Sequence, residues 1–463
     1  MKLSEIDSTL REIGVAPVKT LGQNFLHDQN LARWIVDRAN LSAEDYVVEV
    51  GPGLGALTEF LLASGARVLA IEKDARLANF LRERFPTERL EIIRGDALEF
   101  DVRTLFAQPR VKFVGNLPYN VSSQILLQFA KYPSPISLWL LMLQKEMARR
   151  LSAKPGTPDY GALTLLMQLH YRVEYLRTIP PSVFLPRPDV ESAFVKLEPR
   201  SANELPDCDA ARFKELVRKG FSQRRKQLGK LLRPELADWP TAASAIGANP
   251  KTRAEELSIQ QWITLTNFSD PTRATNESAA SQEEFAVVDQ EDRVIGRAPR
   301  ATVHGNNSRH RAVHILLFNR EGELFLQKRS HLKDRHPCMW DSSAAGHVNY
   351  GEEYDDCARR ELKEELGIPD QVLERVAKLP ASEQTGQEFI WLYRGHHDGP
   401  FQLAASEIEL GEFFPPQVIT KWLNARPEDF APGFVECWRV FRTRAPNPGC
   451  ASGPLAAPRS SFQ

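Results

Sequence analysis

Three carboxylates in the C-terminal half are spaced so that they can bind one cation together. Glu361, Glu364 and Glu365 occupy positions i, i+3 and i+4 of a stretch that predicts a helix, so their side chains share a face. Carboxylates this close repel one another unless a hard divalent cation lies between them, and oxygen ligands suit Mg²⁺ or Mn²⁺. Such a metal can neutralise a diphosphate and activate water. The alternative is an acidic helix face in contact with solvent.

A glycine-rich segment in the N-terminal half has the composition of a nucleotide-binding turn. Residues 49–55 read Glu-Val-Gly-Pro-Gly-Leu-Gly, and glycine lets a backbone turn tightly against a ligand. Glu72 ends the next apolar run, where an acid can accept hydrogen bonds from ribose hydroxyls, and Asp96 can meet an adenine edge. Residues 51–56 also fit the dinucleotide pattern G-x-G-x-x-G/A, and a purely structural turn is a further alternative.

The tetrapeptide Asn116-Leu117-Pro118-Tyr119 separates these alternatives. The Asn116 side-chain oxygen and the Leu117 carbonyl can accept the N–H bonds of an exocyclic amine, and Pro118 makes the backbone rigid there. Tyr119 offers a flat face on which a base can stack. A hydride-transferring enzyme has no use for this set, so the segment favours chemistry on the amine of a base.

Alternating strands and helices are expected to position these residues. Apolar runs at 46–50, 67–71, 90–93 and 111–115 predict strands, and residues 30–39 and 57–63 predict helices. Strands that alternate with helices at this spacing indicate a mostly parallel α/β sheet.

A basic segment follows this α/β pattern. Residues 207–233 are predicted to be helical, and residues 212–233 hold nine basic side chains and one acid, Glu215. Residues 255–267 predict a further helix. This charge suits contact with RNA phosphates, and a solvated helix face is the alternative.

The composition then changes to that of a linker. Residues 269–281 are small and polar, which predicts a connection between domains. Beyond it, residues 284–295 predict a strand, a turn and a strand, and residues 312–318 and 323–327 predict a hairpin. The tail from residue 445 is rich in Pro, Gly, Ala and Ser and is expected to be disordered. The expected organisation is a cofactor-binding domain (1–190), a helical lobe (191–267), a linker (268–282), a second enzyme domain (283–442) and a tail (443–463).

Length and composition agree with several globular domains. The chain has 463 residues, of which 42% are hydrophobic and 26% charged, and this excludes a mostly disordered or collagen-like chain. The net charge of −1 combines +4 over residues 1–270 with −5 over residues 271–463. No apolar run approaches the length of a membrane span, and the N-terminus lacks the pattern of a signal peptide. The 5 scattered cysteines favour a reducing cytoplasm.

The first half resembles the ribosomal RNA adenine dimethyltransferases of the small-subunit methyltransferase A type. The resemblance covers about residues 10–267 and rests on six motifs in family order: Leu21–Leu26, Glu49–Gly55, Glu72, Gly95–Ala97, Asn116–Tyr119 and Val183–Pro188. It implies S-adenosylmethionine as the methyl donor and two adjacent adenosines, in a hairpin near the 3′ end of small-subunit rRNA, as acceptors. Carried over by position, the residues implied to contact the cofactor are Asn24, Leu26, Gly51, Glu72, Asp96 and Asn116. Tyr119 and Phe184 are implied to sandwich the target adenine, with Leu117 and Asn116 at its amine.

The second half resembles the Nudix hydrolases. Residues 346–352 and 360–368, separated by seven residues, match the 23-residue Nudix box at every defined position, and the resemblance covers about residues 283–442. It implies that Glu361 and Glu365 bind the metal and that Glu364 is a ligand or the catalytic base.

Flanking residues are similar to the Nudix branch that includes isopentenyl diphosphate isomerases. His310 and His347 match histidines that bind metal in those isomerases. Ala345 stands where the isomerases carry a catalytic cysteine, and alanine cannot exchange a proton with an allylic carbon. This departure favours hydrolysis over isomerisation, with Cys338 as an unfavoured substitute.

Together these patterns predict a bifunctional α/β enzyme. A Rossmann-like class I methyltransferase domain with a small helical C-terminal lobe is followed by a Nudix α/β/α sandwich. We expect a cytoplasmic monomer that acts in ribosome biogenesis, contacts no membrane and hydrolyses a nucleoside diphosphate or another small diphosphate. Two alternatives remain: a first half that acts mainly as a ribosome assembly factor, and a second half that senses a diphosphate without cleaving it.

Overall fold

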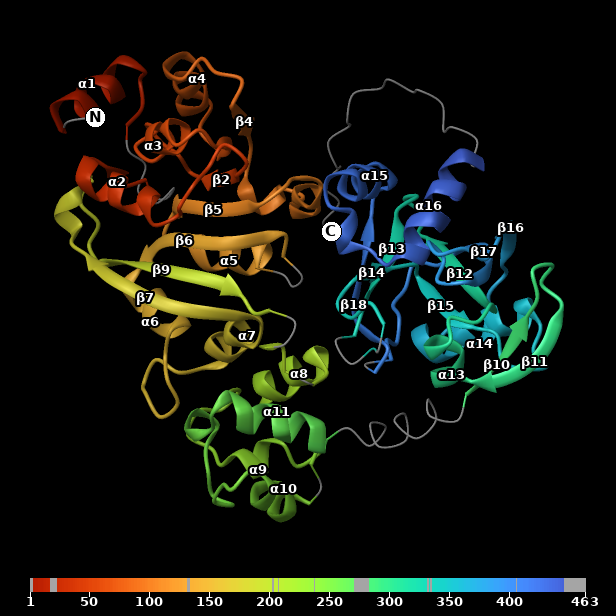
Figure 1. Ribbon diagram of the computed structural model, residues 1–463. Coiled ribbons are helices and arrows are strands. Elements are labelled where there is room, and N and C mark those ends of the chain that lie inside the picture. The colour runs from red at the N-terminus through yellow and green to blue at the C-terminus, as the bar shows by residue number, and fades with distance from the viewer. Residues whose placement is uncertain are drawn as a thin grey trace, which may run out of the picture. The chain divides into compact units, whose positions relative to one another are not determined.

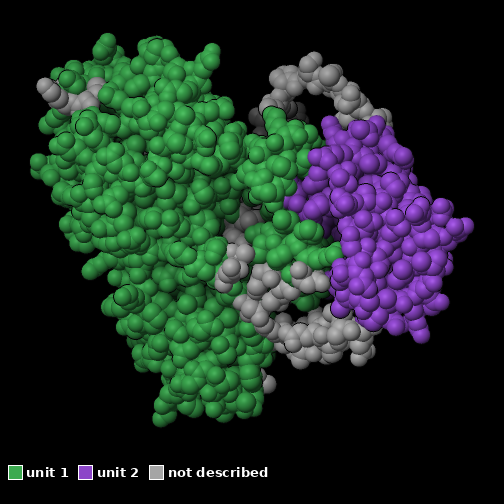
Figure 2. All heavy atoms as spheres, in the orientation of Figure 1, with its two compact units in different colours: residues 1–281, 322–340, 403–429 green, residues 282–321, 341–402, 430–463 purple. Residues whose placement is uncertain are grey.

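The computed structural model describes residues 3–444 apart from 17–22, 131–133, 202–203, 207, 237, 270–282, 331–332, 334 and 405. Most of the predicted linker and the tail from residue 445 therefore lie outside the described residues. The chain divides into two compact units, coloured separately in Figure 2. The first comprises residues 1–281, 322–340 and 403–429, and the second comprises residues 282–321, 341–402 and 430–463.

The first unit is built on a seven-stranded mixed sheet, in the order β4-β3-β2-β5-β6-β9-β7 (Figure 1). Strands β4, β3, β2, β5 and β6 are parallel to one another, and β9 pairs antiparallel with both β6 and β7. The bounds are β2 (Tyr46–Val50), β3 (Arg67–Glu72), β4 (Leu90–Arg94), β5 (Val111–Asn116), β6 (Ile136–Gln144), β7 (Tyr171–Ile179) and β9 (Ser192–Pro199). The predicted parallel strands are confirmed.

Helices cover both faces of this sheet. One face packs on α2 (Gln29–Asp37) and α3 (Thr58–Ala63), and the other on α5 (Ser122–Phe129), α6 (Lys145–Leu151) and α7 (Ala162–His170). Residues of β2 and β3 are buried on both faces, so these strands are continuous apolar runs, whereas the edge strand β4 is only partly buried. The unit also contains α1 (Leu3–Glu12), α4 (Ala75–Arg84), η2 (Ala97–Glu99), η3 (Val102–Ala107), η4 (Pro181–Val183) and the short pair β1 (Phe25–Leu26) and β8 (Phe184–Leu185).

A helical lobe with its own core follows the sheet. It contains α8 (Ala210–Gly220), α9 (Leu228–Leu231), α10 (Trp239–Ala245), η6 (Ala254–Glu256) and α11 (Ile259–Phe268). The single helix predicted over 207–233 is wrong, because α8 ends at Gly220 and α9 begins only at Leu228. A Cβ on Gly220 would lie 2.4 Å from the Trp262 ring, so the close packing of α11 requires glycine there. The helix predicted over 255–267 is a 3₁₀ turn followed by α11, which Ser258 caps.

The first unit also contains segments from the C-terminal half. Strands β13 (Leu324–Arg329) and β18 (Ile408–Phe414) pair antiparallel, and α15 (Pro416–Ala425) and η7 (Pro427–Asp429) follow them. Strand β14 (Trp340–Asp341) has one residue in each unit.

The second unit is organised around the strand β12 (His310–Phe318). This strand pairs antiparallel with β10 (Glu284–Val288) and β15 (Ala344–His347) and parallel with β17 (Glu388–His396). Its other strands are β11 (Val294–Pro299), paired with β10, and β16 (Glu374–Leu379), paired with β17. The helices are α13 (Arg300–Gly305), α14 (Tyr354–Leu366) and α16 (Pro432–Arg444). Both units are of the mixed α/β class, and no helix among the described residues is long and apolar enough to cross a membrane.

Candidate active sites

A cavity of about 140 Å³ in the first unit lies at the carboxyl ends of the parallel strands. This is the edge of an open α/β sheet at which ligands bind. The turns after β2, β3 and β5 all reach it, because parallel strands end at the same side of the sheet. Its lining contains every residue that the sequence assigned to the cofactor: Asn24, Leu26, Gly51, Glu72, Asp96 and Asn116.

The glycine-rich turn after β2 forms one wall of this cavity. Gly53 has φ of +59°, a left-handed conformation that glycine adopts without steric cost, and a Cβ there would lie 3.0 Å from the Phe25 ring. The turn is therefore shaped by close contact with β1, and a side chain at this position would strain it.

Glu72 at the end of β3 holds the same turn in place. Its carboxylate accepts hydrogen bonds from the Gly53 N–H at 3.1 Å and the Asp74 N–H at 2.9 Å. Burial raises the pKa of Glu72 even though these hydrogen bonds act in the opposite direction. Each carboxylate oxygen still has a lone pair to offer, so Glu72 can also accept from a ribose hydroxyl.

Asp96 follows β4 and also lines the cavity. Lys73 donates to its carboxylate at 2.7 Å and holds the pKa of Asp96 below its usual value. Asp96 also caps η2 through the Leu98 N–H. Lys73 was missed from the sequence, although it directly follows Glu72 and lines the cavity.

The side chain of Asn116 has its two ends in different environments. Its Nδ2 donates to the Asn24 carbonyl oxygen at 3.2 Å. Its Oδ1 is buried and has no hydrogen-bond partner among the described residues. A buried acceptor without a partner costs free energy, so Oδ1 is a strong candidate to receive an N–H group from a ligand.

Three residues of the predicted catalytic set do not line this cavity. The Leu117 side chain is buried in the core, and the Tyr119 hydroxyl hydrogen-bonds with Ser192. Phe184 is only 1% exposed and lies in the core beside α2 and α3. A base can reach the Phe184 ring only after this segment moves, so its stacking role stays a prediction.

In the second unit, α14 presents the carboxylates of the acidic site. Glu361 and Glu365 are buried, with 8% and 4% of their surface exposed, whereas the Glu364 side chain is 59% exposed. Arg360 donates to Glu361 and Glu364 and also to Glu352, which lies just before the helix. Glu352 and Arg360 received no role from the sequence, although both belong to the matched box.

The backbone of β15 lies against these carboxylates. The Ala345 N–H donates to Glu365 at 3.1 Å. A Cβ on Gly346 would lie 1.9 Å from Glu361 Oε1, so only glycine leaves room for that carboxylate. Glu361 and Glu365 share one face of α14, and their carboxylates form an oxygen-rich donor set that fits a hard divalent cation.

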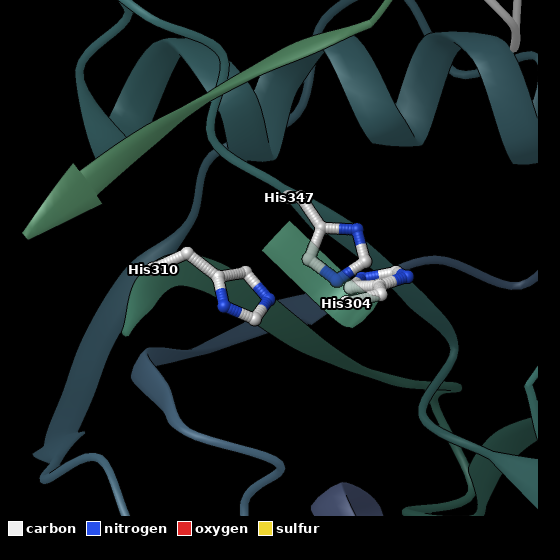
Figure 3. A group of neighbouring side chains, drawn as sticks. All are labelled: His304, His310 and His347. Atoms are coloured by element: carbon white, nitrogen blue, oxygen red, sulfur yellow. The ribbon is translucent and has the colours of Figure 1, made fainter. Parts of the chain in front are cut away.

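Three histidines of the second unit converge on one another in Figure 3. His304 of α13, His310 of β12 and His347 of β15 have ring nitrogens that all lie within 4.8 Å of one another. Glu388 at the start of β17 lies 3.2 Å from His347 Nε2 and 3.5 Å from His310 Nε2.

The ionisation states of this cluster suit metal binding. Burial lowers the pKa of His347 to about 3, so the imidazole is neutral, which is the form that binds metals. Burial alone would raise the pKa of Glu388, but hydrogen bonds from His310 and His347 lower it well below its ordinary value. His310 and His347 were identified from the sequence, whereas His304 and Glu388 were not, because residues brought together from four elements leave no local spacing to detect.

The Rossmann-like sheet, the glycine turn and the orphan amide oxygen define the first half as a methyltransferase. Residues 18–270 match the family described as ribosomal RNA adenine dimethylase, and the chain belongs to this family. It is 41% identical over 252 residues to the ribosomal RNA small subunit methyltransferase A of Aromatoleum aromaticum, covering 54% of this chain and 93% of that protein. The corresponding protein of Chlorobium phaeobacteroides is 40% identical over 251 residues, with coverage of 54% and 93%.

The second half has a match of its own. Residues 308–434 match the NUDIX domain, so the chain combines a methyltransferase with a Nudix hydrolase domain.

Among solved structures, a dimethyladenosine transferase from Plasmodium falciparum is 24% identical with a TM-score of 0.44, covering 52% of this chain and 95% of that one.

Proposed function

We propose that the first half transfers methyl groups from S-adenosylmethionine to N6 of two adjacent adenosines in the 3′-terminal hairpin of small-subunit rRNA. The observation that carries this proposal is the buried Asn116 Oδ1, an unpartnered acceptor in the same cavity as the residues suited to an adenosine. The curated relatives, which are named for the small-subunit rRNA, support the choice of acceptor.

The residues of the cavity divide into a holding set and an orienting set. Glu72 and Asp96 would bind the ribose and the adenine of the cofactor, with Gly51, Asn24 and Leu26 against the rest of it. When bound, S-adenosylmethionine supplies a methyl group already activated by its sulfonium, so no metal is required. The protein has only to hold acceptor and donor in line.

Asn116 orients the acceptor amine. Its Oδ1 and the Leu117 carbonyl would each accept one N–H bond of N6, which leaves the lone pair of the amine to face the methyl group. Tyr119 and Phe184 would stack on the base, with Phe184 displaced from its buried position. An adenine stacked in a helix cannot reach this cavity, so the target base has to be unpaired or extruded.

The helical lobe would bind the RNA backbone. Lys214, Arg218, Arg224, Arg225, Lys226, Lys230 and Arg233 are all exposed on or near α8 and α9. Exposed cations attract phosphates without reading sequence, so this surface would contribute affinity and leave selection of the adenosines to the cavity.

The test is methyl transfer to small ribosomal subunits that lack this modification. We expect two methyl groups on each of two adjacent adenosines, detected by mass spectrometry of the rRNA fragment. If the protein binds the particle and transfers no methyl group, the first half is an assembly factor that retains the fold.

We propose for the second half a Mg²⁺- or Mn²⁺-dependent hydrolysis of a nucleoside diphosphate or another small diphosphate. Glu361 and Glu365 would hold the metal, and Glu364 would be a further ligand or the base that takes a proton from water. A bound metal would supply charge neutralisation and an activated water. Phosphate release from a panel of diphosphates with Mg²⁺ tests this, and tight binding without release would identify a sensor instead.

A second candidate for this half is isomerase-like chemistry, and the histidine cluster with Glu388 favours it. The cluster would hold a metal through His304, His310 and His347. Ala345 argues against isomerisation, because a methyl side chain exchanges no proton. Incubation of the full chain with isopentenyl diphosphate decides the matter: formation of the dimethylallyl isomer, lost in Cys338→Ser, would replace hydrolysis as the proposal.

We further propose that the protein works as a cytoplasmic monomer during ribosome biogenesis. The methyltransferase would occupy residues 1–190, its lobe 191–267 and the Nudix domain 283–442, with a linker at 268–282 and a tail at 443–463. Gel filtration of the full chain tests the monomer.

A further inference from the structure

A single phenylalanine of the methyltransferase half is buried by the C-terminal half. Phe106 belongs to η3, between β4 and β5, and is 6% exposed. Its neighbour Leu105 belongs to the core beside the sheet, whereas Phe106 is not a member of that core cluster. All of the contacts described here lie within the first compact unit.

Phe106 completes a cluster of four aromatic rings. Its centroid lies 4.3 Å from Trp422 of α15, 5.4 Å from Phe414 of β18 and 6.0 Å from Trp340 of β14. These three rings also contact one another, at 5.2 to 5.4 Å. Tilted and edge-to-face rings at such distances are the favourable arrangement for aromatic packing.

Polar contacts surround the cluster. The Arg103 guanidinium forms a fork with Glu323, with two hydrogen bonds of 3.0 Å, and donates to the Phe413 carbonyl oxygen at 2.6 Å. Asp101, the residue that caps the start of η3, also contacts this guanidinium, at 2.9 Å. Arg426 at the end of α15 donates to the Phe106 carbonyl oxygen at 3.0 Å.

These contacts have the features of a specific interface: a buried aromatic side chain, a bidentate ion pair and hydrogen bonds from arginine side chains to backbone carbonyl oxygens around them. The Arg103–Glu323 pair is partly buried, with 28% and 21% of the side chains exposed, and its planar fork fixes the register of the two surfaces. The partner residues Glu323, Trp340, Phe414 and Trp422 all fall within the stretch that matches the Nudix domain.

We propose that η3 is a docking element that fixes the Nudix segments 322–340 and 403–429 to the methyltransferase fold, with Phe106 as its anchor and Arg103–Glu323 as its ion pair. The two enzymes are then joined by a non-covalent interface in addition to the connecting chain at residues 270–282. In this arrangement each half covers an apolar surface of the other.

The experiment severs the covalent connection and leaves the interface as the sole connection. A recognition site for a sequence-specific protease is inserted within residues 270–282 of the full chain, and the native protein is cleaved and run on a gel-filtration column. We expect the two pieces of the unsubstituted protein to elute together at the mass of the intact chain. Phe106→Asp, which places a charge among the rings, should make them elute separately.

Two further variants keep the test independent of folding. Glu323→Arg sets two guanidinium groups against each other at a partly exposed site, and we expect it to weaken association of the cleaved pieces by at least tenfold. Adding Arg103→Glu restores a pair of opposite charges and should recover part of that loss, with Asp101 limiting the recovery. Ile295→Asp, at a position 67% exposed in β11, is the matched control and should leave the pieces together.

The outcomes are distinct. Separation of the unsubstituted pieces, with each piece folded by circular dichroism, would overturn the proposal. Equal association in the unsubstituted protein, Phe106→Asp and Glu323→Arg would also overturn it, because another surface would then hold the halves together.

Discussion

The two candidate sites prepare their chemistry in opposite ways. In the methyltransferase cavity, the backbone does most of the positioning: strand ends, a left-handed glycine turn and an amide anchored to the Asn24 carbonyl hold the acceptors in place. In the Nudix site, the functional groups are carboxylates on one helix, held by a single arginine. The first site offers hydrogen-bonding groups to a ligand, whereas the second brings together carboxylates whose negative charge suits a divalent cation.

The acids of the two sites also differ in their surroundings. Glu49, at the end of β2, is fully buried, and burial raises its pKa to about 8, with Thr58 donating a hydrogen bond to it. Glu49 also lines the cavity beside the glycine-rich turn. In the Nudix site, Arg360 bonds to three acids and so supplies positive charge inside the cluster.

The largest expected effect concerns Asn116. Asn116→Ala removes the proposed acceptor of the amine, and we expect methyl transfer to fall by about 100-fold or more, as when one preorganised hydrogen-bonding group is removed from an active site. Cofactor binding, measured by calorimetry with S-adenosylhomocysteine, should weaken much less. Asn79→Ala, at an exposed asparagine of α4, is the control. Equal losses of binding and transfer would assign Asn116 to the cofactor alone.

Glu365→Gln tests the acidic site of the Nudix domain. The substitution keeps the shape of the side chain and removes its charge, so we expect Mg²⁺-dependent hydrolysis to fall by about 100-fold or more, since a bound metal contributes several kcal/mol. Methyl transfer should be unchanged. Asp356→Asn, on an exposed part of the same helix, should retain hydrolysis. Full hydrolysis by Glu365→Gln would remove this acid from the metal site.

The histidine cluster offers a smaller and separate effect. Titration of the full chain with Zn²⁺ is expected to show one equivalent that His304→Ala weakens by about tenfold, because a neutral imidazole is lost from the set. His396→Ala, on β17 outside the cluster, is the control. Identical titration curves for the two variants would mean that the three histidines pack together without a metal.

The last expected effect concerns how the free energy of unfolding depends on pH. Because the folded pKa of Glu49, about 8, lies above the ordinary value of 4.5, the folded state keeps a proton that the unfolded state releases. Its contribution is therefore complete below pH 4.5 and declines as the pH rises towards 8, by on the order of a few kcal/mol. Glu49→Gln should flatten this decline in denaturant titrations at pH 5 and pH 8. Glu44→Gln, at an exposed acid, should not change it.

Local sequence motifs were sufficient to predict a site wherever each motif contributes its residues from one short segment. All six cofactor residues implied by the resemblance line one cavity. Gly51, Glu72, Asp96 and Asn116 do so because they lie at or just beyond the ends of parallel strands, which meet at one edge of the sheet. The acidic site of the Nudix box could also be predicted, because a single helix carries Glu361, Glu364 and Glu365. Prediction failed at the helix over 207–233: α8 ends at Gly220, which packs closely against the Trp262 ring from a distant part of the sequence.

The sequence by itself determined that the turns bearing functional residues follow strands, that α14 has an acidic face and that the two halves resemble two families. Only the tertiary structure decided which end of Asn116 is left unpaired, that Phe184 is buried, that His304 and Glu388 join His310 and His347, and that Phe106 is covered by Trp340, Phe414 and Trp422. The physical reason is the range of the interaction. Helix and strand periodicity bring together residues a few positions apart, whereas burial, orphaned hydrogen-bond acceptors and converging rings depend on chain segments that meet only once the fold has formed.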